Sequence, residues 1–179
     1  KDIAILYGSP LSTFRSSDGI RGVDNVSGVV KLITKFITIN YPKLSEKYHN
    51  VCLSEKFSDI EKYQKSFEFL HQFTDPAVPN EIIRQAVMNA YEGKSCDYKS
   101  LKELRACEKD VFNWQIPPAI EYLASILKFS SKFSGPVITT NFDPLLKIAL
   151  EKIEEDSSSI VFHNDGSLEK QIDDRLKVV

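Results

Sequence analysis

Cysteine is scarce in this sequence. Only three of its 179 residues are cysteines, Cys52, Cys96 and Cys107, and no two of them form a C-x-x-C pair. An odd number without paired spacing argues against a disulfide framework and against a zinc module. We therefore expect a protein of a reducing compartment such as the cytoplasm, with no bound metal.

Long apolar runs and a charge excess are lacking as well. No stretch approaches the roughly 20 apolar residues that a membrane span needs, and no signal-peptide pattern is present. The 23 Lys and Arg nearly balance the 25 Asp and Glu, for a net charge of -2. This balance gives no sign of a membrane surface or a nucleic acid as partner. The absence of G-x-x-x-x-G-K-[ST] excludes a P-loop.

Short apolar runs alternate with helical patterns along the chain. Residues 3–7, 137–139 and 159–162 are expected strands, and residues 176–179 look like the start of another. Strands that alternate with helices favour a mostly parallel sheet, with ligands at the carboxyl ends of its strands. The predicted fold class is α/β, Rossmann-like, with a large helical insertion.

The helical signals are concentrated in the middle of the chain. A first helix follows a cap at Asp24 or Asn25, carries an apolar stripe from Val29 to Ile37 and ends near Pro42. The expected insert, 42–116, has helical spacing and no strand alternation, and Asn80 is a candidate cap within it. Another helix begins near Pro117 and Pro118, with Ile120, Leu123, Leu127 and possibly Ile126 along it.

Two polar segments follow expected strands and are the candidates for chemistry. Residues 8–12, G-S-P-L-S, come directly after the first strand, where a glycine lets backbone amides approach a pyrophosphate. Residues 139–143, T-T-N-F-D, place Asn141 and Asp143 at the end of another strand. Alternate residues of a strand point to the same side, so both polar groups can enter one pocket. Plainer interpretations are an ordinary turn at Gly8 and a helix cap at Asp143.

Together these segments resemble the sirtuin superfamily. Sirtuins carry G-A-G-x-S, S-x-G-I-P and T-Q-N-I-D elements, which here read G-S-P-L-S at 8–12, S-D-G-I-R at 17–21 and T-T-N-F-D at 139–143. The longer form T-T-N-F-D-P-L-L, with W-x-I-P-P at 114–118, resembles the sirtuin-like domains of prokaryotic antiviral defence proteins. Pro10 stands at a usual glycine and removes one amide donor.

The resemblance implies an NAD+ glycohydrolase that depletes NAD in anti-phage defence, or abortive infection. It also implies fusion to a C-terminal sensor such as a STAND-type NTPase and assembly into a homo-oligomer. The C-x-x-C zinc pairs of deacylating sirtuins are absent, which argues against peptide deacylation and favours hydrolysis of the dinucleotide. Residues 1–179 would then be the N-terminal part of one sirtuin-like domain.

The same resemblance assigns roles to individual residues. Cleavage of the nicotinamide–ribose bond passes through an oxocarbenium-like state. Asn141 would fix the ribose or the attacking water, and Asp143 would hold the nicotinamide amide and stabilise positive charge. The residues implied in NAD binding are Gly8, Ser9, Ser12, Gly19, Ile20, Thr140, Asn141 and Asp143.

A general base remains to be assigned. His163 is the only histidine after Asn141 and is a weak candidate, because a surface or turn histidine is the plainer interpretation. In similar domains a strand leading into H-L-H-G supplies the base, and residues 176–179 would begin that strand. We therefore expect a His-Gly pair shortly after Val179, and no activity from residues 1–179 alone.

Two other classes of function stay open. One is a catalytically silent NAD- or ADP-ribose-binding regulatory module, which needs the glycine loop but not both Asn141 and Asp143. The other is a purely structural helical interaction domain in which the two segments are a coincidence.

Overall fold

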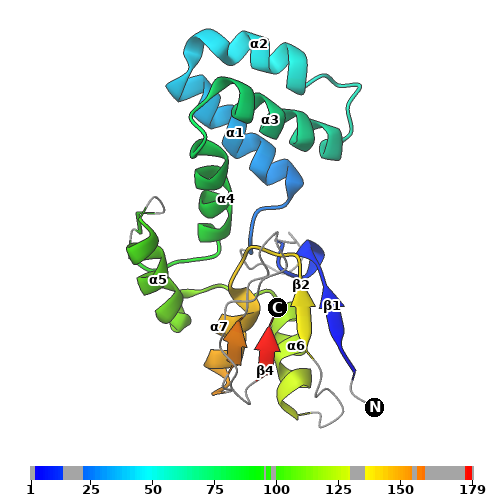
Figure 1. Ribbon diagram of the computed structural model, residues 1–179, viewed down its shortest axis with the longest axis vertical. Helices are drawn as coiled ribbons and strands as arrows, with labels where there is room; N and C mark the ends of the chain where they lie inside the picture. Colours follow the sequence, from blue (N-terminus) through cyan, green and yellow to red (C-terminus); the bar gives the residue numbers. More distant parts are fainter. Residues whose placement is uncertain are drawn as a thin grey trace.

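The computed structural model describes residues 3–13, 22–94, 96–97, 100–129, 136–154, 157–159 and 176–178. It is a mixed α/β structure in which helices outweigh strands. Four helices gather at one end of the molecule, and the sheet with its flanking helices forms the other end (Figure 1). The α/β class expected from the sequence is confirmed.

Every strand pairing in the described sheet is parallel. The strands are β1 (Ile5–Tyr7), β2 (Val137–Thr139), β3 (Ser157–Ser159) and β4 (Leu176–Val178), in the order β1-β2-β4-β3. Strands were expected at 3–7, 137–139 and 176–179, and the structure confirms them apart from their end residues. The strand expected at 159–162 instead begins at Ser157, and residues 160–162 lie outside the described part of the chain.

Two helices beside the sheet bury its apolar side chains. In α6 (Pro118–Phe129) Ile120 and Leu127 are buried, whereas Ile126, a possible core residue from the spacing, is 46% exposed. The neighbouring α7 (Leu145–Lys152) is buried along most of its length. The core formed here includes Tyr7, Trp114, Ile120, Val137, Leu145 and Ile148.

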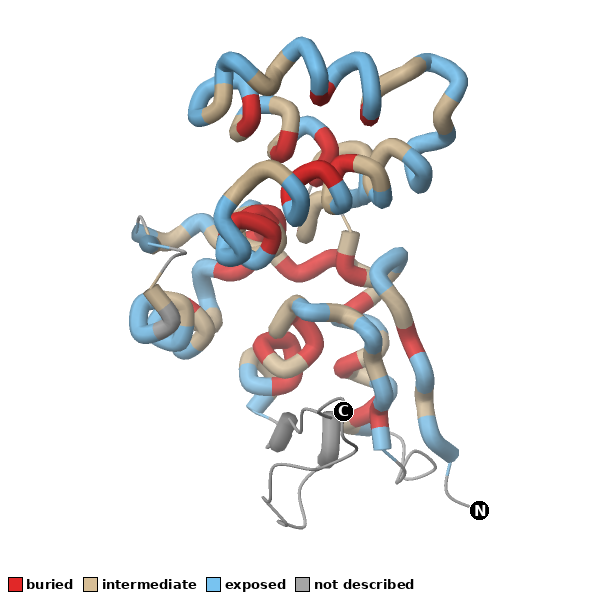
Figure 2. Tube along the Cα trace, turned by 45° about the horizontal axis from the view of Figure 1, so that its top comes forward, coloured by how far each residue is buried: buried red, intermediate tan, exposed pale blue. Residues whose placement is uncertain are grey.

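The helices at the other end have a core of their own. These are α1 (Val26–Asn40), α2 (Pro42–Cys52), α3 (Asp59–Phe73) and α4 (Val78–Met88), which we call the helical unit. As expected, Asn25 caps α1, and its side chain accepts a hydrogen bond from the Gly28 amide. The residues buried between these helices include Ile33, Ile37, Tyr48, Cys52, Leu70 and Ile82. Figure 2 shows buried segments in both parts of the molecule.

The packing divides the chain differently from the expected 42–116 insert. Helix α1 packs with α2, α3 and α4 although it precedes residue 42. Helix α5 (Leu101–Lys109) and the 3-10 turn η3 (Val111–Asn113) fall within that range, yet Cys107 and Trp114 belong to the core of the sheet. Asn80 is not a cap, because α4 begins two residues earlier, where Pro79 suits the first turn.

The chain enters and leaves the helical unit at adjacent points. The side-chain amide of Asn89, just after α4, donates to the carboxylate of Asp24, just before α1. The Asp24 backbone amide also donates to the Ala86 carbonyl, at 3.3 Å. These bonds tie the start of α1 to the end of α4, so the two connections of the helical unit lie side by side.

Candidate functional site

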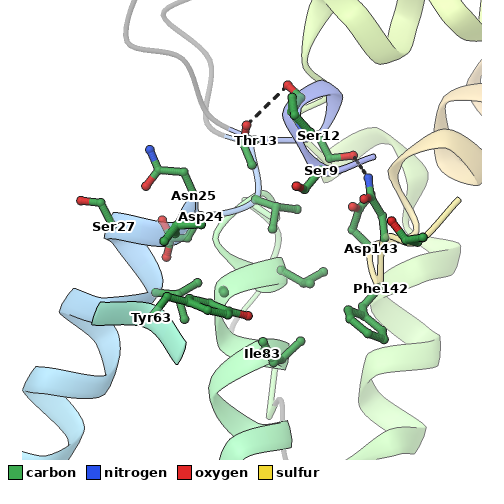
Figure 3. Close-up of a pocket in the computed structure, with 18 of the residues that line it drawn as sticks. Ser9, Ser12, Thr13, Asp24, Asn25, Ser27, Tyr63, Ile83, Phe142 and Asp143 are labelled. Carbon is green, nitrogen blue, oxygen red and sulfur yellow. Dashed lines mark hydrogen bonds between the residues drawn. The ribbon is translucent and has the colours of Figure 1, made fainter. Parts of the chain in front are cut away.

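A cleft of about 500 Å³ lies between the carboxyl ends of β1 and β2 and the helical unit. On one side it is lined by the turn after β1, including Ser12, and by Asn141 and Asp143, which follow β2. On the other side lie Asp24 and Tyr63 of the helical end (Figure 3). The two polar segments selected from the sequence therefore face one cavity.

The segment after β1 forms a single 3-10 turn, η1 (Ser9–Leu11), rather than an irregular loop. The Ser12 amide donates to the Ser9 carbonyl at 3.0 Å, and the Val23 amide donates to the Ser12 carbonyl at 3.0 Å. These two bonds hold Ser12 in a buried position beside the end of β2. Ser9 and Ser12 line the cleft, as expected.

Gly8 is not among the residues that line the cleft, contrary to its expected contact with the ligand. Gly8 is the residue before η1, and the residues that line the cleft begin with the next one, Ser9. A side-chain carbon at Gly8 would lie 4.0 Å from Thr140 Oγ1, an ordinary contact distance. Gly8 therefore packs next to the end of β2 and is not required to be glycine by lack of space.

The segment after β2 turns sharply before α7. The Asn141 amide donates to Thr139 Oγ1 at 3.0 Å, and the Leu145 amide donates to Asp143 Oδ1 at 3.1 Å. Asp143 is therefore not the N-cap of α7, which is Pro144, but its Oδ1 accepts from the first amide of that helix. Asn141, Phe142 and Asp143 all line the cleft, and the Phe142 side chain is 86% exposed.

Ser12, Asn141 and Asp143 form one hydrogen-bonded group. Asn141 Nδ2 donates to Ser12 Oγ at 2.9 Å. The side chains of Ser12 and Asn141 also hydrogen-bond the Asp143 carboxylate, which can only accept. Among the described residues nothing donates to Asn141 Oδ1. The amide is therefore held by its nitrogen, and its carbonyl oxygen is available to a ligand.

The carboxyl group of Asp143 sits in an unfavourable place for a charge. Burial raises its pKa, against the lowering effect of the hydrogen bonds from the Leu145 amide and the Ser12 and Asn141 side chains. Nearby, burial raises the pKa of Tyr7 to about 12, with a smaller contribution from the Asp143 charge. Titratable groups with shifted pKa values in a cleft are typical of functional sites.

The opposite side of the cleft was not expected from the sequence. Asp24 and Asn25 precede α1, Asp59 and Tyr63 come from α3, and Ile83 comes from α4. Sequence spacing gave no signal for these residues, because each one follows an ordinary helix pattern. They reach the cleft only through the packing of α1, α3 and α4 against one another.

The remaining expected site residues have different outcomes. Thr140 lines the cleft and is exposed. Gly19, Ile20 and His163 lie outside the described residues. His49 and His71 are exposed on α2 and α3, and neither lines the cleft. Within the described ranges, no group of three or more His, Cys, Asp or Glu side chains is placed to hold a metal ion.

The described part of the chain contains no helix that is long and apolar enough to cross a membrane. Comparisons with protein-family models, with curated proteins and with solved structures gave no match. The cleft can hold a polar group of a ligand by the Ser12–Asn141–Asp143 group, and an apolar or aromatic group of the same ligand against the helical unit.

Proposed function

We propose that this chain binds NAD in the cleft and hydrolyses its nicotinamide–ribose bond, within a Rossmann-like α/β domain. The observation that carries the proposal is the meeting of Ser12, Asn141 and Asp143 in one cleft at the carboxyl ends of parallel strands. Ligands of open parallel sheets bind at that edge. The sequence resemblance to sirtuins supplies the identity of the ligand.

The reaction needs water as its second substrate. Water adds to the ribose C1′ as the bond to the pyridinium nitrogen breaks, and the electron pair of that bond leaves with neutral nicotinamide. One proton passes to solvent, and ADP-ribose remains. The Asn141 carbonyl would accept a hydrogen bond from the ribose or from the attacking water. The partly desolvated Asp143 carboxylate would stabilise the positive charge that develops on the sugar.

A specific observation also favours a silent binding module. Among the described residues no histidine lines the cleft, so the part of the site that the structure describes lacks the base that sirtuins use. Such a module would bind NAD or ADP-ribose and leave the nicotinamide bond intact. The defence role, the fused sensor domain, oligomerisation and a cytoplasmic location belong to this proposal and rest on the sequence resemblance.

The test is incubation of the full-length protein with NAD, with chromatographic measurement of nicotinamide and ADP-ribose. We expect equal release of both products by the parent. The Asn141→Ala variant should be slower by about a hundredfold or more, since the loss of one transition-state hydrogen bond typically has this effect.

The matched control is Asn40→Ala. Asn40 is exposed at the end of α1 and does not line the cleft, and its side chain also makes one hydrogen bond, to the Phe36 carbonyl at 2.9 Å. We expect this variant to keep the parent's rate. NAD binding without release of nicotinamide would favour the silent module. A parent that neither binds nor cleaves NAD would overturn both alternatives.

A further inference from the structure

Tyr63 places an aromatic ring on the side of the cleft opposite the Ser12–Asn141–Asp143 group. It lies on α3, one turn after the start of that helix, and lines the cleft with Ile83 and Val87 of α4. The ring packs beside Phe67, with centroids 4.8 Å apart, so its position is held by the helical unit. Its hydroxyl end is turned toward the middle of the cleft (Figure 3).

The Tyr63 hydroxyl makes no hydrogen bond with another described residue. A tyrosine whose ring is packed and whose hydroxyl lacks a protein partner can give that hydroxyl to a ligand. Burial raises the pKa of this phenol, so it stays a neutral donor across the working pH range. The ring and the hydroxyl together suit a flat ligand group that carries polar atoms at its edge.

The charges around Tyr63 exclude one part of a dinucleotide from this side. Asp24 and Asp59 line the cleft here, and no Lys or Arg is among the described residues that do. A diphosphate would meet two carboxylates with no cation lining the cleft beside them, which is unfavourable for like charges. A base carries no negative charge and can stack on an aromatic side chain.

We propose that the helical unit supplies the base-recognition half of the site, with Tyr63 holding a heteroaromatic base of the ligand by stacking and by a hydrogen bond from its hydroxyl. This inference rests on the proposed function, because it takes a dinucleotide as the ligand. NAD has two such bases, adenine and nicotinamide, and both offer a flat ring with polar groups at the edge. Residues of the helical unit thereby determine which base the site accepts.

The experiment titrates the full-length protein by calorimetry with the two halves of NAD, nicotinamide mononucleotide and AMP. The variant Tyr63→Leu removes the ring, and Tyr63→Phe keeps the ring and removes the hydroxyl. Tyr122→Leu is the control, since Tyr122 is 70% exposed on α6 and does not line the cleft. Thermal unfolding of each variant reports any loss of stability separately.

We expect Tyr63→Leu to weaken one of the two halves by about tenfold or more, the usual effect of removing a stacking side chain. The half that is weakened identifies the base at Tyr63. Tyr63→Phe should weaken the same half by about two- to tenfold, as for one neutral hydrogen bond. Tyr122→Leu should leave both affinities unchanged.

Two results would overturn the inference while leaving the proposed function intact. One is a Tyr63→Leu variant that binds both halves with the affinity of the parent. The other is an equal loss for both halves with a lowered melting temperature, which indicates a merely structural role. If the parent cleaves NAD but binds neither half, only the inference fails; if it neither binds nor cleaves NAD, the proposed function fails and the inference fails with it.

Discussion

At the scale of single residues, Asp143 lines the candidate site but carries a charge that burial makes unfavourable. One oxygen accepts from the Leu145 amide at 3.1 Å and so supports the start of α7. Even with this bond and those from Ser12 and Asn141, burial keeps the pKa of the carboxyl raised. A raised pKa means that the charged form is less stable in the folded protein than in the unfolded chain. A charge kept in such a place is typical of a group with a role in binding or catalysis.

The consequence for pH dependence follows from this shift. The folded-state pKa of Asp143 lies above the unfolded value of about 3.9, so between these two values the folded state holds more protons. Stability from this group therefore falls as pH rises through that window. We predict that Asp143→Asn has a higher melting temperature than the parent at pH 7, and that the difference shrinks as pH falls toward about 4.

Asp75→Asn is the matched control, measured by calorimetric unfolding between pH 4 and pH 8. Asp75 is exposed, and its Oδ1 accepts from the amide two residues later, Ala77, at 2.9 Å, as Asp143 does with Leu145. We expect little change in melting temperature for this variant at either pH. An Asp143→Asn protein that is less stable than the parent at pH 7 would contradict the account of Asp143.

At the scale of elements, α3 connects the fold of the helical unit to the cleft. It begins with a capping box, in which Ser58 Oγ accepts from the Glu61 amide at 3.3 Å and Glu61 Oε2 accepts from the Ser58 amide at 2.8 Å. The first two turns carry Asp59 and Tyr63 into the cleft. The cap therefore orders one wall of the cleft as well as a helix end.

We predict that Ser58→Ala lowers stability by about 1 kcal/mol, the usual cost of losing such a cap. For a chain of this size that corresponds to a fall in melting temperature of about 2–4 °C. Ser125→Ala is the control, because Ser125 lies within α6 and its hydroxyl only donates back to the Glu121 carbonyl at 2.9 Å. Alanine is a good helix former there. Equal melting temperatures for Ser58→Ala and the parent would show that the cap contributes nothing.

The elements also show which features could be predicted from sequence. Local patterns were sufficient for β2 and for a cap at Asp24 or Asn25, of which Asn25 is the one observed, because both features depend on residues close in the chain. They were also sufficient to place Asn141 and Asp143 in one pocket, because alternate residues of a strand point to the same side.

One local helix boundary and the long-range packing could not be predicted in the same way. The start of α4 was misplaced because Asn80 looks like a cap although Pro79 already lies inside the first turn. The contribution of Tyr63 to the cleft depends on how α3 packs with α1 and α4. Neither spacing nor composition records that packing, so the second wall of the site emerged only from the structure.

At the scale of the whole molecule, two cores meet at the cleft. One surrounds the sheet and the other lies within α1–α4. The chain passes from one core to the other beside the Asp24–Asn89 hydrogen bond, and Tyr91, which packs against the core of the sheet, pairs there with Trp114. A ligand in the cleft would contact both parts, and it would therefore stabilise each of them when it binds.

Hydrogen exchange of the full-length protein, with and without saturating ADP-ribose, tests this claim most directly. The account predicts added protection on both walls of the cleft, at residues 9–13 and 139–146 on the sheet side and at 59–63 and 83–87 on the helical side. The exposed residues of α2, away from the cleft, should exchange at unchanged rates. The account would be contradicted by protection on only one wall, by protection at the opposite end of the sheet, or by no added protection with the ligand bound.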